Sequence, residues 1–171
     1  NPRITYITWS PDDSRIAFTH TAATGVELWV IDVATAKATR ITGADLNANM
    51  GMPYSWHKDN TSLLVRTIPA NRSALIDSKK DLPTGPIIST ADGRVSQNRT
   101  YQDLLKNKTD EQNFETLISS ELYNVGVDGS KKLFKNTDMY SEQSISPDGN
   151  YIMLTTIKKP FSYIVPLSRF P

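Results

Sequence analysis

One short unit occurs three times in this sequence, and the repeat limits the possible folds more than any other feature does. Residues 7–13 read ITWSPDD, residues 54–60 read YSWHKDN and residues 144–150 read SISPDGN. Each copy is followed at once by a second apolar run, such as RIAFT at residues 15–19. Pro, Asp, Asn and Gly between two such runs favour a tight turn. Each copy therefore predicts a β-hairpin.

A second hairpin pattern follows the first. It reads ELWVIDV at residues 27–33 and ELYNVGVDG at residues 121–129, and each is followed by another apolar run. The segment FSYIV at residues 161–165 is expected to open a third copy. One complete repeat therefore has four strands. Trp9 and Trp56 lie 47 residues apart, just above the roughly 40–45 residues of a four-stranded propeller blade.

The second copy contains an insertion between its second and third strands. Compared with the first copy it is 47 residues longer, and the excess falls at about residues 69–119. Its first half is rich in Pro and Gly and is expected to be loop. Thr100 with Asp103 resembles a helix capping box, and apolar spacing from Asp110 to Ile118 predicts one or two helical turns.

These lengths predict an all-β fold, a partial β-propeller of about two and a half four-stranded antiparallel blades with a loop and short-helix insertion. The expected units are a blade at 1–47, a blade at 48–140 with the insertion at 69–119, and a partial blade at 141–171. A closed propeller needs about four to eight blades. We therefore expect a sector cut from a longer protein, and we expect the isolated fragment to self-associate through its open strand edges.

Composition argues against several classes of function. The formal net charge is +1, so there is no basic excess for nucleic acid binding. No apolar run approaches the roughly 18 residues of a membrane span. The chain has no Cys and only 2 His, which leaves little for a metal or cofactor site, and none is expected.

The sequence predicts no catalytic centre within this chain. It contains no G-x-S-x-G serine motif, and His20 and His57 fall at equivalent ends of neighbouring repeats and are expected at the surface or rim. The three Trp residues recur at repeat positions and favour packing between blades. The alternative is a stacking platform for a sugar, which would place Trp9, Trp29 and Trp56 on the channel surface.

Several longer strings resemble one family. The W-S-P-D-D and S-P-D-G copies are similar to the repeats of Tol-type and prolyl-oligopeptidase-type propellers. NRTYQDLLKN at residues 98–107 and TIKKPFSYIVP at residues 156–166 resemble one branch of the prolyl oligopeptidase family of serine peptidases. That branch includes dipeptidyl or alanyl-aminopeptidase-like proteins and plastid glutamyl endopeptidases. The second copy departs from the pattern, with His57-Lys58 where the family repeat has Ser-Pro.

The resemblance implies an N-terminal propeller that covers a C-terminal α/β-hydrolase domain and gates the access of peptides. The family's Ser, Asp and His all lie in the hydrolase part, so no catalytic residue is carried over to this chain. The implied partners are the hydrolase domain of the same parent chain and its peptide substrates, and bacterial members suggest an extracytoplasmic location. Candidate contacts to substrate or to the hydrolase domain are Arg94, Arg99, Tyr101 and Asp103.

An alternative from another class is a stand-alone Tol-type propeller that acts as a scaffold for protein interactions. The two hypotheses differ in the sequence expected after the propeller in the parent chain. A serine peptidase requires a downstream G-x-S-x-G motif with Asp and His after it, whereas a scaffold does not.

Overall fold

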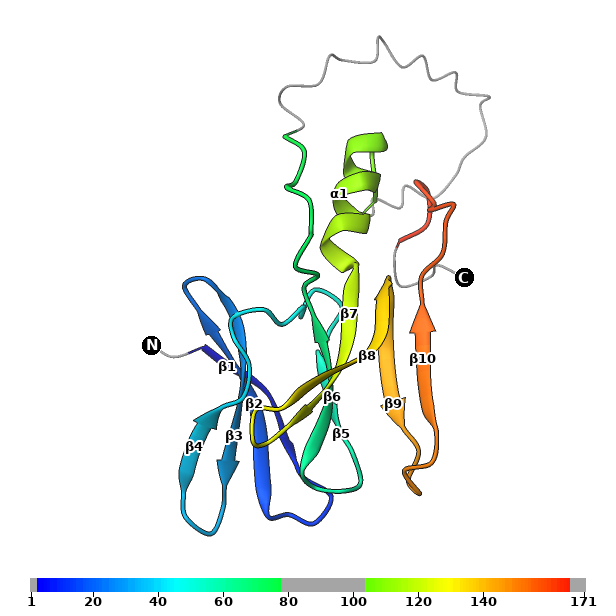
Figure 1. Cartoon of the computed structure of the whole chain (residues 1–171). Helices are drawn as coiled ribbons and strands as arrows, with labels where there is room; N and C mark the ends of the chain where they lie inside the picture. The colour runs from blue at the N-terminus through cyan, green and yellow to red at the C-terminus, as the bar shows by residue number, and fades with distance from the viewer. Residues whose placement is uncertain (1–2, 78–103, 167–171) are drawn as a thin grey trace, which may run out of the picture.

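Three antiparallel β-sheets lie side by side in the computed structural model, which describes residues 3–77 and 104–166 (Figure 1). The first sheet, blade 1, has the strand order β1-β2-β3-β4. Its strands are β1 (Arg3–Trp9), β2 (Arg15–Ala22), β3 (Gly25–Asp32) and β4 (Lys37–Arg40). Each strand is hydrogen-bonded to the next along the chain, as expected of consecutive hairpins.

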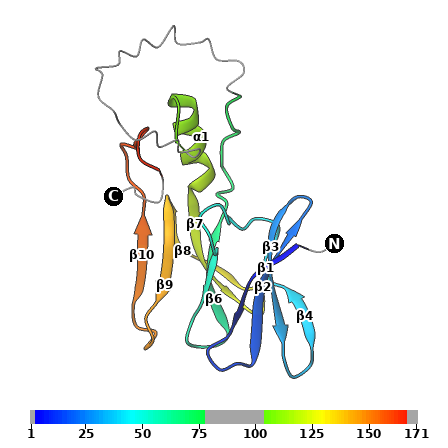
Figure 2. The same ribbon diagram turned by 180° about the vertical axis from the view of Figure 1, so that it is seen from behind.

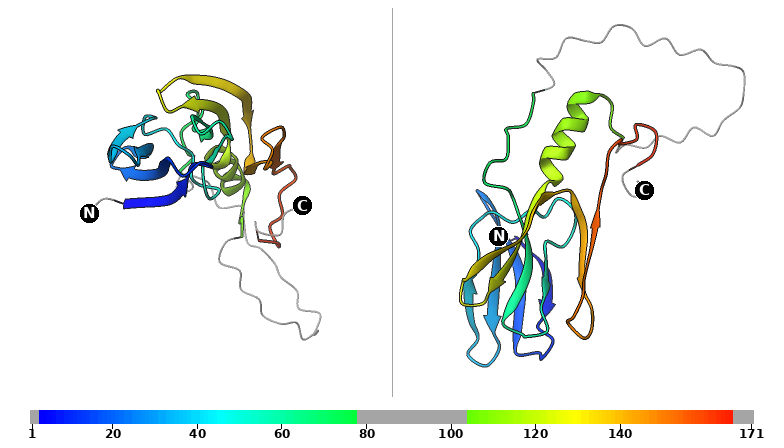
Figure 3. Two further views of the ribbon diagram at one scale, coloured as in Figure 1. Left: turned by 90° about the horizontal axis from the view of Figure 1, so that it is seen from below. Right: turned by 45° about the vertical axis from the view of Figure 1, so that its right-hand side comes forward.

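The second sheet, blade 2, repeats this order as β5-β6-β7-β8. Its strands are β5 (Tyr54–Trp56), β6 (Ser62–Thr67), β7 (Ser120–Gly126) and β8 (Lys131–Asp138). β6 and β7 are direct neighbours although residues 68–119 separate them in sequence. The described part of this connection contains α1 (Lys108–Ile118), which extends beyond one end of the sheets (Figure 3).

The third sheet is a partial blade that pairs β9 (Tyr140–Ile145) with β10 (Ile152–Thr156). Two four-stranded sheets and one two-stranded sheet confirm the predicted fold class. The expected third copy of the second hairpin is wrong, because residues 157–166 form no strand. Phe161 packs instead in a cluster with Ile118 and Met139. The exact blade boundaries stay a prediction.

The first turn of each blade has the same backbone conformation. Asp13, Asn60 and Gly149 occupy equivalent positions, with φ of 59°, 61° and 77°. Their backbone N–H groups donate to carbonyls three residues earlier, at 2.9, 3.3 and 2.8 Å. Asp, Asn and Gly are the residues that tolerate positive φ most readily, which explains why the motif varies within this set at that position.

These turns also contact one another at one end of the sheets. The backbone N–H of Asp12 donates to Asn60 Oδ1 at 3.0 Å, and Arg15 Nη1 donates to the Asn60 carbonyl at 3.0 Å. Gly149 lies against the Lys58 side chain, so closely that a Cβ at position 149 would lie 3.0 Å from Lys58 Cβ. The three turns therefore form a continuous row, at the end opposite α1 (Figures 1 and 2).

The main core lies between blade 1 and blade 2. Its buried members are Ala17, Leu28, Val30, Ile41 and Leu46 from blade 1 and the segment after it, with Tyr54, Leu63, Val65 and Val125 from blade 2. The Tyr54 hydroxyl crosses the seam to the carbonyls of Ala17, at 2.9 Å, and Tyr6. Burial raises the pKa of Tyr54 to about 12, so the phenol remains a neutral hydrogen-bond donor.

A second seam joins blade 2 to the partial blade. Leu64, Leu122 and Tyr140 are buried there, and Ile152 and Leu154 pack against them. Successive side chains of a strand point to opposite faces, so β6 supplies both seams, with Leu63 and Val65 on one side and Leu64 on the other. This explains why its residues 63–65 are all apolar. Within the described ranges, no helix has the length and hydropathy to cross a membrane.

Candidate functional site

A groove of about 300 Å³ lies between β9 and the segment that leads into β5. β5 and β9 are the first strands of adjacent sheets and lie next to each other, with Ser55 Oγ donating to the Gln143 carbonyl at 3.3 Å. The lining residues of this β5–β9 groove are Met50, Gly51, Met52, Arg66, Ser141, Glu142, Gln143, Ser144 and Met153. One wall is the irregular segment at residues 50–52, and the other is the edge strand β9. Arg66 lies between the two walls and determines their spacing.

Arg66 is 1% exposed. It lies two positions after Leu64 on β6 and so points to the same side, toward the partial blade. A charged side chain is rarely buried unless its donors are satisfied. Arg66 is the one charged residue of β6, and its contacts explain why its burial is tolerated.

The Arg66 guanidinium donates four hydrogen bonds to backbone carbonyls. Nη1 reaches Tyr140 and Ser141, both at 2.9 Å. Nη2 reaches Met50 at 3.0 Å and Met52 at 2.6 Å. Burial lowers the pKa of Arg66 to about 10, and the side chain remains protonated at neutral pH. One cation therefore holds both walls of the groove together.

The rim of the groove combines apolar and hydrogen-bonding groups. Met52 and Met153 are 42% and 62% exposed, and methionine adapts its shape to irregular apolar partners. Glu142 and Ser144 are exposed on β9 and offer a carboxylate and a hydroxyl. Such a surface suits contact with an extended polypeptide.

The second candidate region is a helical lobe, formed by α1 and residues 157–166. Asn107 caps α1, with its Oδ1 accepting from the Asp110 backbone N–H at 2.8 Å. The acidic residues Asp110 and Glu111 lie in the first turn, where their negative charge stabilises the helix by interacting with the positive end of its dipole. The helical segment predicted from Asp110 to Ile118 is confirmed, and it begins two residues earlier than expected.

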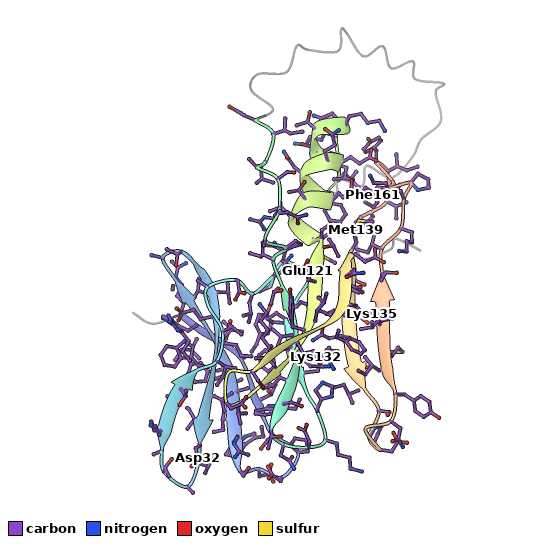
Figure 4. The ribbon with its side chains drawn as sticks, in the orientation of Figure 1. Asp32, Glu121, Lys132, Lys135, Met139 and Phe161 are labelled. Carbon is purple, nitrogen blue, oxygen red and sulfur yellow. The ribbon has the colours of Figure 1, made fainter. Side chains whose placement is uncertain are left out.

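Side chains connect α1 to the C-terminal segment. Phe114 and Phe161 pack edge to face with ring centroids 5.2 Å apart. The Tyr163 hydroxyl donates to Glu111 Oε2 at 2.6 Å, which lowers the pKa of that carboxyl. Figure 4 labels Phe161 and Met139 beside the base of the helix, where both are buried. The lobe is therefore anchored to the sheets through the end of the partial blade.

The residues proposed from the sequence as contacts to substrate or to a hydrolase domain lie outside the described ranges. They are Arg94, Arg99, Tyr101 and Asp103. The capping box expected at Thr100 falls there as well, and Leu104–Lys106 just after it are not helical. These assignments stay predictions.

Each of the two histidines contacts a polar side chain from another part of its own sheet. His57 Nε2 lies 2.8 Å from Asn124 Oδ1, and His20 Nδ1 lies 3.1 Å from Glu27 Oε2. Trp29 Nε1 also donates to Glu27 Oε2, at 2.9 Å, and this bond contributes most to the lowered pKa of the carboxyl. Within the described residues, no three His, Cys, Asp or Glu side chains gather into a group that could hold a metal ion.

The sequence interpretation did not identify the β5–β9 groove. Arg66 follows LLV in β6, and a charged residue in an inward position of a buried strand is a signal that could have marked it. The groove itself was not predictable, because its two walls, residues 50–52 and 141–144, lie far apart in the sequence. Only the packing of the partial blade on blade 2 brings them together.

Comparison with known proteins gives two consistent results. The chain is 35% identical over 179 aligned residues to probable chloroplastic glutamyl endopeptidases of Oryza sativa subsp. japonica and Arabidopsis thaliana. These alignments cover 99% of this chain but only 19% and 18% of the two relatives. The chain thus spans about a fifth of their length. No family model matches it.

Among solved structures, a prolyl endopeptidase is similar with a TM-score of 0.52 and 13% sequence identity. The match covers 90% of this chain and 18% of that one. This likeness concerns the fold.

The stacked four-stranded sheets, each built from consecutive hairpins, define the chain as a sector of a β-propeller. The alignments with the two glutamyl endopeptidases, together with this fold, support its interpretation as a propeller fragment similar to those of prolyl-oligopeptidase-type peptidases.

Proposed function

We propose that this chain is the non-catalytic propeller portion of a longer serine peptidase, in which it gates the access of peptides and shapes the substrate site of an α/β-hydrolase domain. The observation that carries the proposal is the alignment of 99% of the chain with about a fifth of each glutamyl endopeptidase. A segment of that size leaves ample length in such a protein for a separate catalytic domain.

The β5–β9 groove supports a role in contacting peptides. Propeller blades surround a central channel, and the groove opens between corresponding edge strands of two sheets, where a channel would run. Arg66 fixes its walls, and Met52 and Met153 provide adaptable apolar contact. An extended peptide can enter between adjacent edge strands and contact these groups, whereas a folded domain cannot.

The experiment compares the longer protein with the isolated 171-residue chain, using peptides that contain glutamyl residues. The longer protein is expected to hydrolyse them in a reaction that a serine-directed inhibitor abolishes, and the isolated chain is expected to be inactive. Turnover by the isolated chain, or none by the longer protein, would contradict the proposal. The second result would favour the scaffold hypothesis.

The gating role has its own test in the longer protein. Met153→Ser and Glu142→Gln are expected to raise KM for extended peptides several-fold and to leave the hydrolysis of a dipeptide substrate unchanged. The matched control is Leu133→Ser, at an exposed apolar residue on the outermost strand β8, which should alter neither value. Equal effects of all three variants would argue against the groove as a peptide contact.

A further inference from the structure

Two buried side-chain atoms of the β5–β9 groove have no hydrogen-bond partner among the described residues. They are Arg66 Nε, which carries a hydrogen and can only donate, and Gln143 Oε1, which can only accept. Both residues line the groove. A buried polar atom without a partner destabilises a folded chain, and such atoms are uncommon in native proteins. The two atoms have opposite requirements, so one group with both an acceptor and a donor satisfies them together.

The other donors of Arg66 are all in use. Its two Nη atoms donate to the carbonyls of Met50, Met52, Tyr140 and Ser141. A guanidinium has five N–H donors in one rigid plane, and Nε–H is the fifth. The guanidinium cannot turn to find another acceptor without losing these four bonds. Arg66 therefore holds one charged donor in a fixed position beside the groove.

The side-chain amide of Gln143 is also fixed. Its Nε2 donates to the Leu64 carbonyl at 2.9 Å, and the Gln143 backbone carbonyl accepts from Ser55 Oγ at 3.3 Å. Exchange of the amide oxygen and nitrogen would place Oε1 against the Leu64 carbonyl, where the two acceptors would repel each other. The orientation of the amide is therefore set, and Oε1 is the atom that accepts from a ligand.

The charges of the groove favour a neutral ligand. Glu142 lines the groove with Arg66, and its carboxylate acts on the guanidinium in the direction that raises the pKa of Arg66. An anionic ligand would satisfy Arg66 Nε but would be repelled by Gln143 Oε1 and by Glu142. A cationic ligand would be repelled by Arg66. A neutral amide, which has one acceptor and one donor, suits both unpartnered atoms.

An extended polypeptide carries this pair of groups on each residue other than proline. In a β-strand, the N–H and C=O of one residue point to the same side, which is how the residues of a hydrogen-bonded pair exchange two bonds. Met52 and Met153 line the groove with exposed side chains, which can adapt to the side chains of a peptide. A contact made through the backbone therefore tolerates different peptide sequences.

We propose that the β5–β9 groove binds the backbone of an extended peptide, with the C=O of one residue accepting from Arg66 Nε and its N–H donating to Gln143 Oε1. The choice of a peptide as the ligand rests on the proposed function. Arg66 and Gln143 are then the residues that position the peptide, and the groove does not select for a charged side chain.

The test follows the NMR signal of Arg66 Nε–H in the isotopically labelled 171-residue chain, at a concentration at which light scattering shows a monomer. The first probe is N-acetyl-trialanine methylamide, which is uncharged and has free backbone N–H groups. The second is the same peptide with every amide N-methylated, which keeps the acceptors and lacks the donors. Sodium acetate, an anion without a donor, is the third.

The unmodified peptide is expected to shift the Arg66 Nε–H signal saturably, and the N-methylated peptide to bind about three- to tenfold more weakly, as expected for one lost hydrogen bond. Acetate should leave the signal unchanged. No shift with the unmodified peptide, or equal binding of the two peptides, would overturn the inference. A stronger response to acetate would do so as well, because it would indicate an anion site.

A variant tests the acceptor separately. Gln143→Met is expected to weaken binding of the unmodified peptide about three- to tenfold, and Gln112→Met, the same change at an exposed residue of α1, should not alter it. Equal affinities of the two variants would contradict the role of Gln143. If Gln143→Met does not fold, the comparison of the two peptides in the unmodified chain still decides.

Hydrolysis of peptides by the longer protein is measured in parallel. Binding by the chain without hydrolysis by the longer protein would refute the proposed function and leave the backbone contact standing. Hydrolysis without a response of Arg66 Nε–H would overturn the backbone contact and leave the proposed function standing.

Discussion

Arg66 Nη1 donates to the backbone carbonyl of Tyr140 at 2.9 Å, across a sequence separation of 74 residues. The bond joins β6 of blade 2 to the first residue of β9, and the same guanidinium also binds the segment before β5. One buried cation therefore bridges blade 2, the partial blade and the segment before β5.

Replacement of Arg66 by Met is expected to destabilise the chain by about 3 kcal/mol or more, because hydrogen bonds to charged groups contribute about 1.5–3 kcal/mol each and the buried carbonyls lose their donor. The measurement is the free energy of unfolding in urea. Arg72→Met, the same change at an exposed residue, should shift it by less than about 0.5 kcal/mol. Similar values for both variants would contradict the assigned role.

Two substitutions of Asn60 separate the conformation of the turn from its contact with the neighbouring blade. Asn60→Gly accommodates the positive φ but loses the bond from the Asp12 N–H, whereas Asn60→Ala loses the bond and retains the strain. Alanine is expected to be the more destabilising by about 1 kcal/mol, as measured by thermal and urea unfolding. A glycine variant less stable than the alanine variant would show that φ does not govern this position.

The repeated turns predict a loss of stability in acid. Hydrogen bonds from Ser10 and Ser146 hold the pKa of Asp12 and of Asp148 down to about 2, below the roughly 3.9 of an unfolded Asp. The ionised carboxylates thus stabilise the fold above pH 4, and this contribution is lost as the pH falls toward 2.

Asp12→Asn and Asp148→Asn should therefore flatten the dependence of unfolding free energy on pH between 5 and 2. Asp13→Asn is the matched control, because Asp13 lies in the same turn and Asn also tolerates its positive φ. A profile for the Asp12 variant as steep as that of the unmodified chain would refute this account.

Phe114 and Phe161 should behave as a coupled pair. A double-mutant cycle with Ala at both positions is expected to give a coupling energy of about 0.5–1.5 kcal/mol, the range for edge-to-face aromatic pairs. Limited proteolysis within α1 and within residues 157–166 should accelerate in each single variant. Strict additivity of the two unfolding energies would indicate that the rings do not connect the lobe.

The isolated chain is expected to self-associate, because the outermost strand β1 leaves the apolar side chains of Ile4, Ile7 and Trp9 exposed. Light scattering at high micromolar concentration should detect species larger than the monomer, and Trp9→Ser should reduce them. Tyr151→Ser, at a 73% exposed aromatic residue in a turn, is the comparison and should have a smaller effect. A clean monomer at that concentration would contradict the prediction of self-association.

The sequence alone determined the elements that depend on neighbouring residues. Turn motifs specify hairpins locally, through the φ angles that Asp13, Asn60 and Gly149 can adopt, and their spacing implied four-stranded blades. Apolar spacing separately predicted a helical segment that ends at Ile118. Residues 161–165 show the limit of this reasoning. Their apolar residues suit a strand, but Phe161 is buried in a cluster that includes Ile118 and the partly buried Phe114, and tertiary packing overrode local propensity.

Only the tertiary structure decided which surfaces are buried and which remain open. Trp9 and Trp56 occupy equivalent positions in their repeats, yet Trp56 packs in the seam with blade 1 while Trp9 is exposed. Likewise, nothing in the sequence around Arg66 specifies carbonyl partners from residues 50–52 and 140–141. Local sequence fixes backbone conformation, whereas burial depends on which sheets stack, and that is settled by contacts between residues far apart in the chain.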